Sequence, residues 1–274
     1  MPDTAQAPAY TAELERLVAI LGVPFHQTTL AGAVESIDGM VARGGSHYVV
    51  TPNVDFLVKA RRDPELRSIL VHADLVLCDG KPIVWASHFL SGILPSRVAG
   101  SDLIPLLLQR GAEKGWRIFL LGGSPAVAAE AARRIASTHP ELRDVSHYSP
   151  PFRPLAEMDN EGIFARIRAA RPDIMLVCFG CPKQEKWISR NLRQLDVPVM
   201  IAAGATVDFL AGSMARAPAW MQRSGTEWVF RLLQEPRRLV RRYVDDIVHF
   251  IPAVLRQRWS QRPSGAKSER NDRP

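Results

Sequence analysis

Apolar residues along the chain fall into short runs that alternate with longer segments of helical periodicity. Six of the runs are rich in Val, Ile, Leu and Phe without strict polar alternation, which is typical of strands buried on both faces. These runs are residues 47–51, 75–78, 117–121, 145–148, 174–179 and 197–203, and the helical segments between them are 54–70, 101–114, 125–138, 157–170 and 183–194. The alternation of strand and helix predicts an α/β fold with a mainly parallel, doubly wound sheet.

The pattern changes toward the C-terminus. Residues 226–260 have a helical pattern throughout, with interruptions expected at Pro236 and Pro252, and the longer part begins with an arginine cluster of Arg237, Arg238, Arg241 and Arg242. A basic amphipathic helix is typical of contact with an anionic membrane surface. The alternative is a helix packed on the body of the protein, with its arginines in solvent.

The charge distribution supports a separate C-terminal part. Residues 1–215 hold equal numbers of basic and acidic side chains, so the net charge of +7 comes from residues 216–274, which hold 13 basic and 6 acidic ones. The partner of this part is expected to be anionic: phosphate, acidic lipid or nucleic acid. We divide the chain into a body over 9–215, a basic helical appendage over 216–262 and a disordered tail over 263–274.

Composition limits the class of protein. An apolar share of 46% in 274 residues is a globular value and excludes a collagen-like or wholly disordered chain. Three cysteines are too few for a disulfide scaffold and favour a reducing compartment. No apolar run approaches the ~18 residues that a membrane span needs. We therefore expect a cytoplasmic protein.

Polar residues directly after the predicted strands are the first candidates for chemistry, because ligands of such sheets bind at the carboxyl ends of the strands. Asp79 follows the strand 75–78 and can act as a general base, or it can cap the next helix. Thr51 and Asn53 follow the strand 47–51 and can bind a sugar or a base, with capping again the alternative for Asn53.

Three further strand ends carry candidate ligand groups. Gly122 and Gly123 open a helix and can admit a phosphate to free N–H groups, although an ordinary turn is equally consistent. Gln184 lies in the first turn of a helix after a glycine turn, and Asp208 can bond a ribose or sugar or be a buried turn carboxylate. The pair Cys178 and Cys181 lacks the further ligands of a zinc site, and the absence of an Asp-x-Asp sequence leaves a divalent metal without obvious ligands.

Seven stretches in order along residues 25–245 resemble the WecG/TagA/CpsF family of bacterial glycosyltransferases, which is glycosyltransferase family 26. The stretches are Thr51-Pro52-Asn53, Asp79-Gly80, Arg97 through Leu103, Phe119 through Gly123, Gly180 through Glu185, Gly204 through Phe209, and Arg216-Ala217-Pro218 with Glu227-Trp228, Arg231-Leu232 and Glu235 through Arg238. No single stretch is decisive, but seven in the same order are highly specific.

The resemblance implies a Rossmann-like catalytic domain that transfers a sugar from a UDP-sugar with inversion and without metal or other cofactor. The acceptor it implies is a sugar on a polyprenyl diphosphate, at the inner face of the cytoplasmic membrane. Asp79 matches the proposed general base of the family, and Thr51, Asn53, Arg97 and Gln184 match other active-site positions. We add Gly122, Gly123 and Asp208 as substrate-binding residues. Appendage arginines match residues thought to reach the lipid diphosphate, here Arg231, Arg238 and Arg241 with the neighbouring Arg237.

The donor sugar stays open among N-acetylmannosamine, its uronic acid and glucose. The run that starts at Lys81 is more polar than is usual in the family, and Lys81 itself is a candidate for contact with a uronate. Two other classes of protein are weighed against the transferase. A nicotinamide-dependent oxidoreductase predicts a G-x-G-x-x-G motif with a ribose-binding acid some twenty residues on, and neither is present. A nucleic-acid-binding protein predicts salt-sensitive binding that does not need Asp79, and we expect no nucleic-acid partner.

Overall fold

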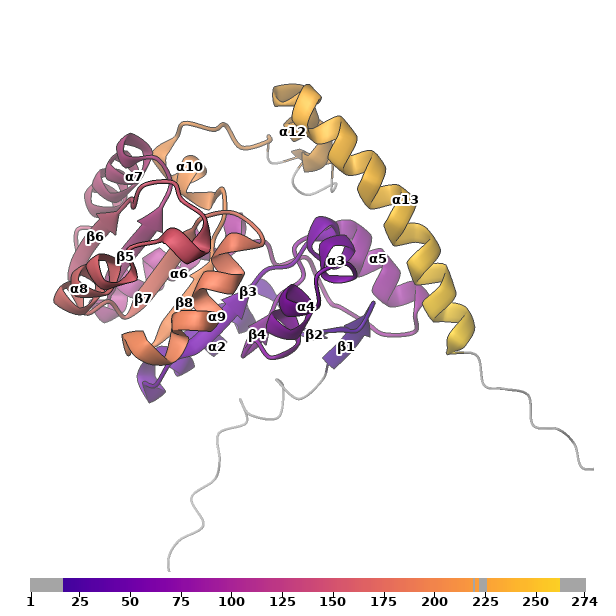
Figure 1. The fold of residues 1–274 in the computed structure, drawn as a ribbon, viewed down its shortest axis with the longest axis horizontal. Helices are drawn as coiled ribbons and strands as arrows, with labels where there is room; N and C mark the ends of the chain where they lie inside the picture. Colours follow the sequence, from indigo (N-terminus) through magenta and orange to yellow (C-terminus); the bar gives the residue numbers. More distant parts are fainter. Residues whose placement is uncertain (1–16, 219, 222–225, 262–274) are drawn as a thin grey trace, which may run out of the picture.

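The computed structural model describes residues 17–218, 220–221 and 226–261, and its centre is a six-stranded parallel sheet (Figure 1). The strand order is β4-β3-β8-β7-β5-β6, and every neighbouring pair is parallel. The strands are β3 (His47–Val50), β4 (Leu75–Val76), β5 (Arg117–Gly122), β6 (Asp144–Tyr148), β7 (Ile174–Cys178) and β8 (Val199–Ala202). The six predicted strands and the doubly wound α/β fold are confirmed.

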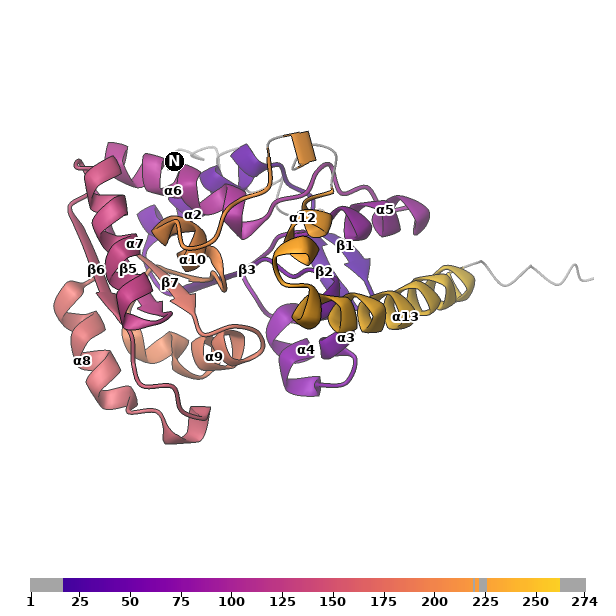
Figure 2. The same ribbon diagram turned by 90° about the horizontal axis from the view of Figure 1, so that it is seen from above.

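Helices cover both faces of the sheet, so the strands are apolar on both sides. Alternate strand residues face two separate cores, with Val50 in one and Val49 in the other. Figure 2 shows α2 and α6 on one side of the sheet and α8 and α9 on the other. One layer consists of α2 (Leu30–Arg43), α6 (Gly100–Lys114), α7 (Pro125–Thr138) and α10 (Thr206–Ala211), and the other of α3 (Val54–Ala60), α4 (Pro64–Val71), α8 (Asn160–Ala170) and α9 (Lys183–Leu195).

The structure corrects several predicted boundaries. The single helix expected over 54–70 is two helices, because Asp63 caps α4 through the N–H of Leu66 and Pro64 occupies its first turn. The segment 157–170 begins with a short 3-10 turn, η1 (Leu155–Glu157), before α8. Pro252 was expected to interrupt the last helix, but it lies inside the continuous helix α13 (Pro236–Ser260).

Two strands and three α-helices were not among the predicted elements. The hairpin of β1 (Leu17–Ile20) and β2 (Val23–His26) turns at Leu21 and Gly22, which both have positive φ, as a two-residue hairpin turn requires. The others are α2 and α5 (Lys81–Phe89), and the short α10 that follows β8.

The C-terminal appendage lies along one flank of the body. It consists of α12 (Glu227–Gln234) and the long α13, which packs against α3 (Figure 1). Phe250 and Val254 of α13 are buried in the core beneath α3. At the far end of α13 the Gln257 side chain accepts from the N–H of Leu21 at 2.8 Å and donates to the carbonyl of Ala19 at 2.9 Å. The C-terminal half of α13 is therefore tied to the body; the predicted tail 263–274 lies outside the described residues.

Gly122 is held in place by a close approach between two strands. It ends β5 with a φ of 107°, and a Cβ there would lie 2.8 Å from the carbonyl oxygen of Cys178 on β7. Gly115, after α6, also has a positive φ, of 65°, but a Cβ there would meet nothing within 4 Å.

We expect Gly122→Ala to lower the free energy of unfolding by about 3 kcal/mol, because backbone strain and overpacking add. Gly115→Ala is the matched control and carries only the strain of the left-handed conformation, about 1 kcal/mol. Urea denaturation of the two variants compares the costs directly. Equal losses of unfolding free energy in the two variants would show that the contact of residue 122 with the Cys178 carbonyl adds nothing to the cost.

Candidate active site

The largest group of predicted site residues surrounds one cleft at the carboxyl edge of the sheet. The cleft has a volume of about 340 Å³. The loops after four strands border it: Thr51 after β3, Asp79 after β4, Gly180 after β7 and Gly204 after β8. The appendage forms its remaining wall with Arg231, Leu239 and Arg242. This is the place where doubly wound sheets bind ligands, because helices leave β7 and β8 toward opposite faces.

Asp79 lies in the cleft and does not cap the next helix. Gly80 occupies the N-cap position of α5 without a side-chain bond, so the capping alternative is excluded. The backbone N–H of Asp79 donates to the carbonyl of Pro52 at 3.0 Å, which joins the loops after β4 and β3. Burial raises the pKa of Asp79 to about 6, against the opposing effect of the Arg97 and Arg231 guanidinium groups. The carboxyl is therefore ionised at neutral pH but close to its titration range, as suits a general base.

Arg97 is the centre of an ion-pair network beside Asp79. Its guanidinium lies 2.5 Å from Asp102 at the start of α6, 3.3 Å from Glu227 at the start of α12 and 3.7 Å from Asp79. Asp102 also pairs with Arg216. The network therefore joins the carboxyl edge of the sheet to the first residues of the appendage.

Arg231 enters the same network from the appendage side. It pairs with Glu227 at 3.0 Å, one turn back on α12, and its guanidinium lies 5.1 Å from the centre of the Phe209 ring. Two guanidinium groups, those of Arg97 and Arg231, thus share one carboxylate at the border of the cleft. Glu227 is 8% exposed, so this sharing takes place largely away from water.

Thr51 and Asn53 also border the cleft. Asn53 caps α3, because its Oδ1 accepts from the N–H of Phe56 at 3.3 Å, yet it is also part of the cleft wall. Asn53 can therefore cap the helix through its oxygen and still offer its amide nitrogen to a ligand. Thr51 is buried, and its hydroxyl faces Gly100, which also borders the cleft.

Gln184 is the most enclosed of the predicted site residues. It is 2% exposed and lies in the first turn of α9. Its Oε1 accepts from the N–H groups of Gly180 at 3.0 Å and Gly204 at 3.1 Å, which fixes the loops after β7 and β8 relative to each other. Its Nε2 donates to Glu185 at 2.7 Å.

Several predicted residues lie outside the cleft wall. The N–H of Gly123 donates to the carbonyl of Cys178 at 3.2 Å, so it is not free for a phosphate, and Gly122 is buried within β5. Asp208 lies in the first turn of α10, and Lys81 begins α5; neither borders the cleft. Arg237 and Arg241 are exposed on α13. The side chain of Arg238 lies outside what the structure describes.

Three charged residues at the site were not predicted from the sequence as site residues. Glu227 and Asp102 hold Arg97, and Arg242 borders the cleft from α13. The helical spacing of α13 contains a signal for Arg242, because it lies three residues after the buried Leu239 and four before the buried Asp246. Glu227 and Asp102 lack such a helical pattern, but both lie in stretches that carry the resemblance to the family.

A second charged group lines the side of the cleft beneath α13. Lys59 and Asp55 of α3 pair at 2.7 Å, and both border the cleft with Arg242. Burial raises the pKa of Asp246 on α13 to about 6, and the nearby Asp55 adds to the shift. Across the described residues no three or more His, Cys, Asp or Glu side chains are arranged to hold a metal ion.

Comparison with known proteins decides the family. The model of the glycosyl transferase WecG/TagA/CpsF family matches residues 18–264, which include the whole cleft and both appendage helices. The chain belongs to this family. The protein is therefore a glycosyltransferase, and the oxidoreductase alternative is wrong.

Curated relatives of this glycosyltransferase come from Staphylococcus aureus. Those of strains MW2, NCTC 8325 and MRSA252 are each 29% identical over 226 residues, which cover 82% of this chain and 87% of the relative. Each is an N-acetylglucosaminyldiphosphoundecaprenol N-acetyl-beta-D-mannosaminyltransferase.

The electrostatics of the glycosyltransferase cleft can be tested through Asp79. Glu227 raises the pKa of Asp79 and Arg97 lowers it, so Glu227→Gln is expected to lower this pKa below its value of about 6. NMR titration of the Asp79 carboxyl carbon measures the shift. Glu113→Gln is the control, because Glu113 pairs with Arg110 on α6 and is not among the charges acting on Asp79. A pKa of Asp79 that stays or rises in Glu227→Gln would show that the network does not act on the carboxyl.

Proposed function

We propose that this protein is an inverting glycosyltransferase that moves a sugar from a UDP-sugar to a sugar carried on a polyprenyl diphosphate, with Asp79 as general base and without a metal. One observation carries the proposal: the Asp79 carboxylate borders the cleft with Arg97 and Arg231 beside it. The arrangement places a base and two cations at one site.

Asp79 supplies what an inverting transfer requires of a base. The acceptor hydroxyl must lose its proton as it attacks the anomeric carbon, and a carboxylate with a pKa of about 6 can take that proton at neutral pH. The bond from the anomeric carbon to the UDP oxygen breaks as the new glycosidic bond forms. UDP leaves with the electron pair of that bond.

The arginines supply positive charge for the diphosphates. The planar guanidinium fork binds phosphate oxygens in pairs, and charge on the departing UDP grows in the transition state. Arg97 and Arg231 are now shared among Asp79, Asp102 and Glu227. A diphosphate in the cleft competes with these carboxylates for the same donors. We assign Arg242 to this set as well, because it borders the cleft from α13.

The relatives guide the choice of substrates. Their printed names give N-acetylmannosamine as the sugar transferred and an N-acetylglucosaminyl diphosphoundecaprenol as acceptor. We propose the same acceptor class here and place N-acetylmannosamine first among the three donor sugars. Lys81, the candidate for contact with the uronic acid, does not border the cleft, which removes the reason to prefer that donor.

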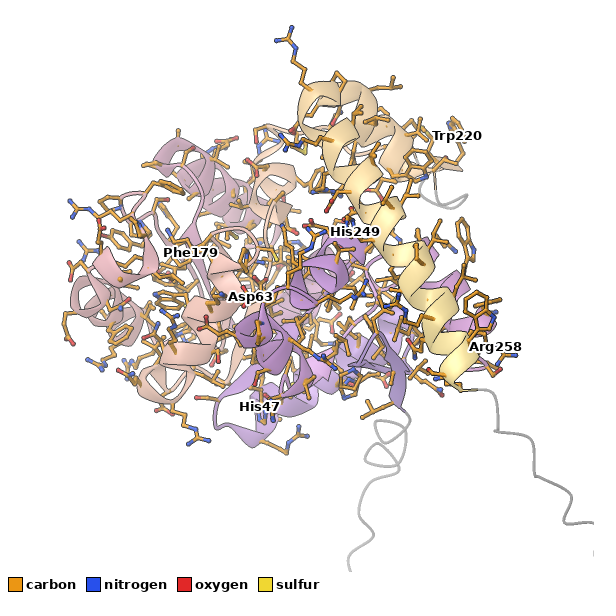
Figure 3. The ribbon with its side chains drawn as sticks, turned by 45° about the vertical axis from the view of Figure 1, so that its right-hand side comes forward. His47, Asp63, Phe179, Trp220, His249 and Arg258 are labelled. Carbon is orange, nitrogen blue, oxygen red and sulfur yellow. The ribbon has the colours of Figure 1, made fainter. Side chains whose placement is uncertain are left out.

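We further propose that the exposed face of the appendage docks on the membrane that carries the acceptor. Apolar residues of α13 repeat at helical spacing on its exposed face: Val240, Val244, Ile247, Ile251, Leu255 and Trp259. Trp220 and Arg258 lie near the two ends of this helix (Figure 3). The Arg258 guanidinium lies 5.9 Å from the Phe89 ring, so the exposed Trp85 and Phe89 of α5 adjoin the same surface. No helix in the described part of the chain is long and apolar enough to cross a membrane.

The proposal is tested by measuring UDP release from a panel of UDP-sugars with a synthetic prenyl-diphosphate N-acetylglucosamine acceptor in the presence of EDTA. Acceptor-dependent release from one donor is expected. Release that stops in EDTA and returns with Mg²⁺ would contradict a metal-free transfer. Release with a different nucleotide sugar alone would contradict the donor class.

Asp79→Asn is expected to lower kcat by a factor of about 100 or more, because the amide cannot take the proton, while UDP-sugar affinity stays nearly unchanged. Asp102→Asn is the matched control, since it also removes a carboxylate from Arg97 but does not border the cleft. It should cost much less. Similar losses in both variants, measured by UDP release, would assign the effect to the ion-pair network and not to a base.

Ile251→Glu is expected to weaken the binding of the protein to anionic liposomes, because it places a charge within the exposed apolar face of α13. Val71→Glu is the control, since it adds the same charge at an exposed apolar residue at the end of α4. Liposome flotation measures both variants. Equal binding of Ile251→Glu and the unaltered protein would contradict docking through this face.

A further inference from the structure

Three hydrogen bonds fix the direction in which the Gln184 side-chain amide points. Two of its partners are backbone N–H groups, of Gly180 at 3.0 Å and Gly204 at 3.1 Å, and these can only donate. The third partner is the Glu185 carboxyl, at 2.7 Å, which in its ionised form, the main form at pH 8, can only accept. The oxygen must therefore face the two glycines and the nitrogen must face Glu185. A flipped amide would lose all three bonds in a place that is 2% exposed.

The same geometry determines what Gln184 has left for a ligand. A carbonyl oxygen accepts two hydrogen bonds, and both are used by the glycine N–H groups. The amide nitrogen has two hydrogens, and Glu185 takes one. Since Gln184 borders the cleft, the second hydrogen is the polar group that it can offer there. Gln184 thus meets a ligand as a donor.

Burying the Glu185 carboxyl is unfavourable for folding, and packing alone does not explain why a carboxyl is present there. It is fully buried, with 0% exposure, and burial raises its pKa to about 7. Its second oxygen, Oε2, has no hydrogen-bond partner within the described residues, although the nearby Cys181 thiol acts to lower the pKa of the carboxyl. A buried carboxyl with an unused oxygen is unfavourable for folding, so an apolar residue would serve packing better. An apolar residue, however, could not accept the hydrogen bond from the Gln184 amide.

We propose that Glu185 is a positioning residue that holds the Gln184 amide as a hydrogen-bond donor to an oxygen of the bound donor sugar. The inference rests on the proposed transfer from a UDP-sugar and adds the polarity of one of its contacts. A carbonyl oxygen, such as that of an acetamido group, satisfies a donor fully. A ligand group that can only donate a hydrogen bond would not be bound by Gln184, because its oxygen already accepts two.

Binding measured by calorimetry at pH 8 tests this with UDP and UDP-N-acetylmannosamine as separate probes. Glu185→Leu removes the acceptor for Gln184, so affinity for the UDP-sugar is expected to fall about tenfold, while affinity for UDP stays unchanged because UDP lacks the sugar. Glu185→Gln keeps an acceptor oxygen in nearly the same place and should restore most of the affinity. Equal affinity for the UDP-sugar in Glu185→Leu and the unaltered protein would overturn the proposal, and so would a parallel loss for UDP.

Gln184→Glu tests the polarity by a second route that does not depend on the folding of Glu185→Leu. The new carboxyl keeps an oxygen for both glycines but replaces the donating nitrogen with an oxygen. Affinity for the UDP-sugar should fall at pH 8, because the new carboxylate has no hydrogen to donate to the sugar. Affinity for the UDP-sugar equal to that of the unaltered protein would count against a donor role. If the unaltered protein itself bound no UDP-sugar, the proposed function would fail, and this inference with it.

Discussion

Arg97 lies among three carboxylates that belong to three parts of the chain: Asp79 at a strand end, Asp102 at the start of α6 and Glu227 in the appendage. The positive charge of this largely buried guanidinium group is balanced by the carboxylates around it. The appendage provides part of that balance through Glu227. The position of α12, and hence of Arg231, therefore depends on the same contact that sets the electrostatics of Asp79.

This dependence explains how a parallel sheet and a helical appendage form one site. The sheet brings Thr51, Asp79, Gln184 and Gly204 to a common edge, because all of its strands end on the same side. The appendage then covers that edge with cations while its opposite face stays apolar and exposed. One element thus presents cations to the cleft on one side and an exposed apolar face on the other, which is the arrangement that the proposed membrane-anchored acceptor requires.

The sequence contains the fold more completely than the site. Buried strands are visible as apolar runs, and the break at Asp63-Pro64 is a local signal that the prediction overlooked. Gly122 and Gly123 have the composition of a phosphate turn, but the pairing of β5 with β7 occupies the N–H of Gly123, and such pairing has no local pattern. The active-site roles of Asp79 and Gln184 were predicted mainly from the resemblance to the family. Glu227 acts on Arg97 through a contact that only tertiary structure creates, whereas Glu185 directly follows Gln184 in the sequence.

The proposed reaction depends on one step above all, in which Asp79 takes the proton of the acceptor hydroxyl. A crystal structure of the Asp79→Asn variant with UDP-N-acetylmannosamine and a short prenyl-diphosphate N-acetylglucosamine tests it most directly, because the bound substrates cannot react. If Asp79 is the base, the acceptor hydroxyl lies within about 3.2 Å of the side chain at position 79, and arginines contact both diphosphates. A hydroxyl bonded instead to another carboxyl of the cleft, such as Asp55 or Glu235, would contradict it.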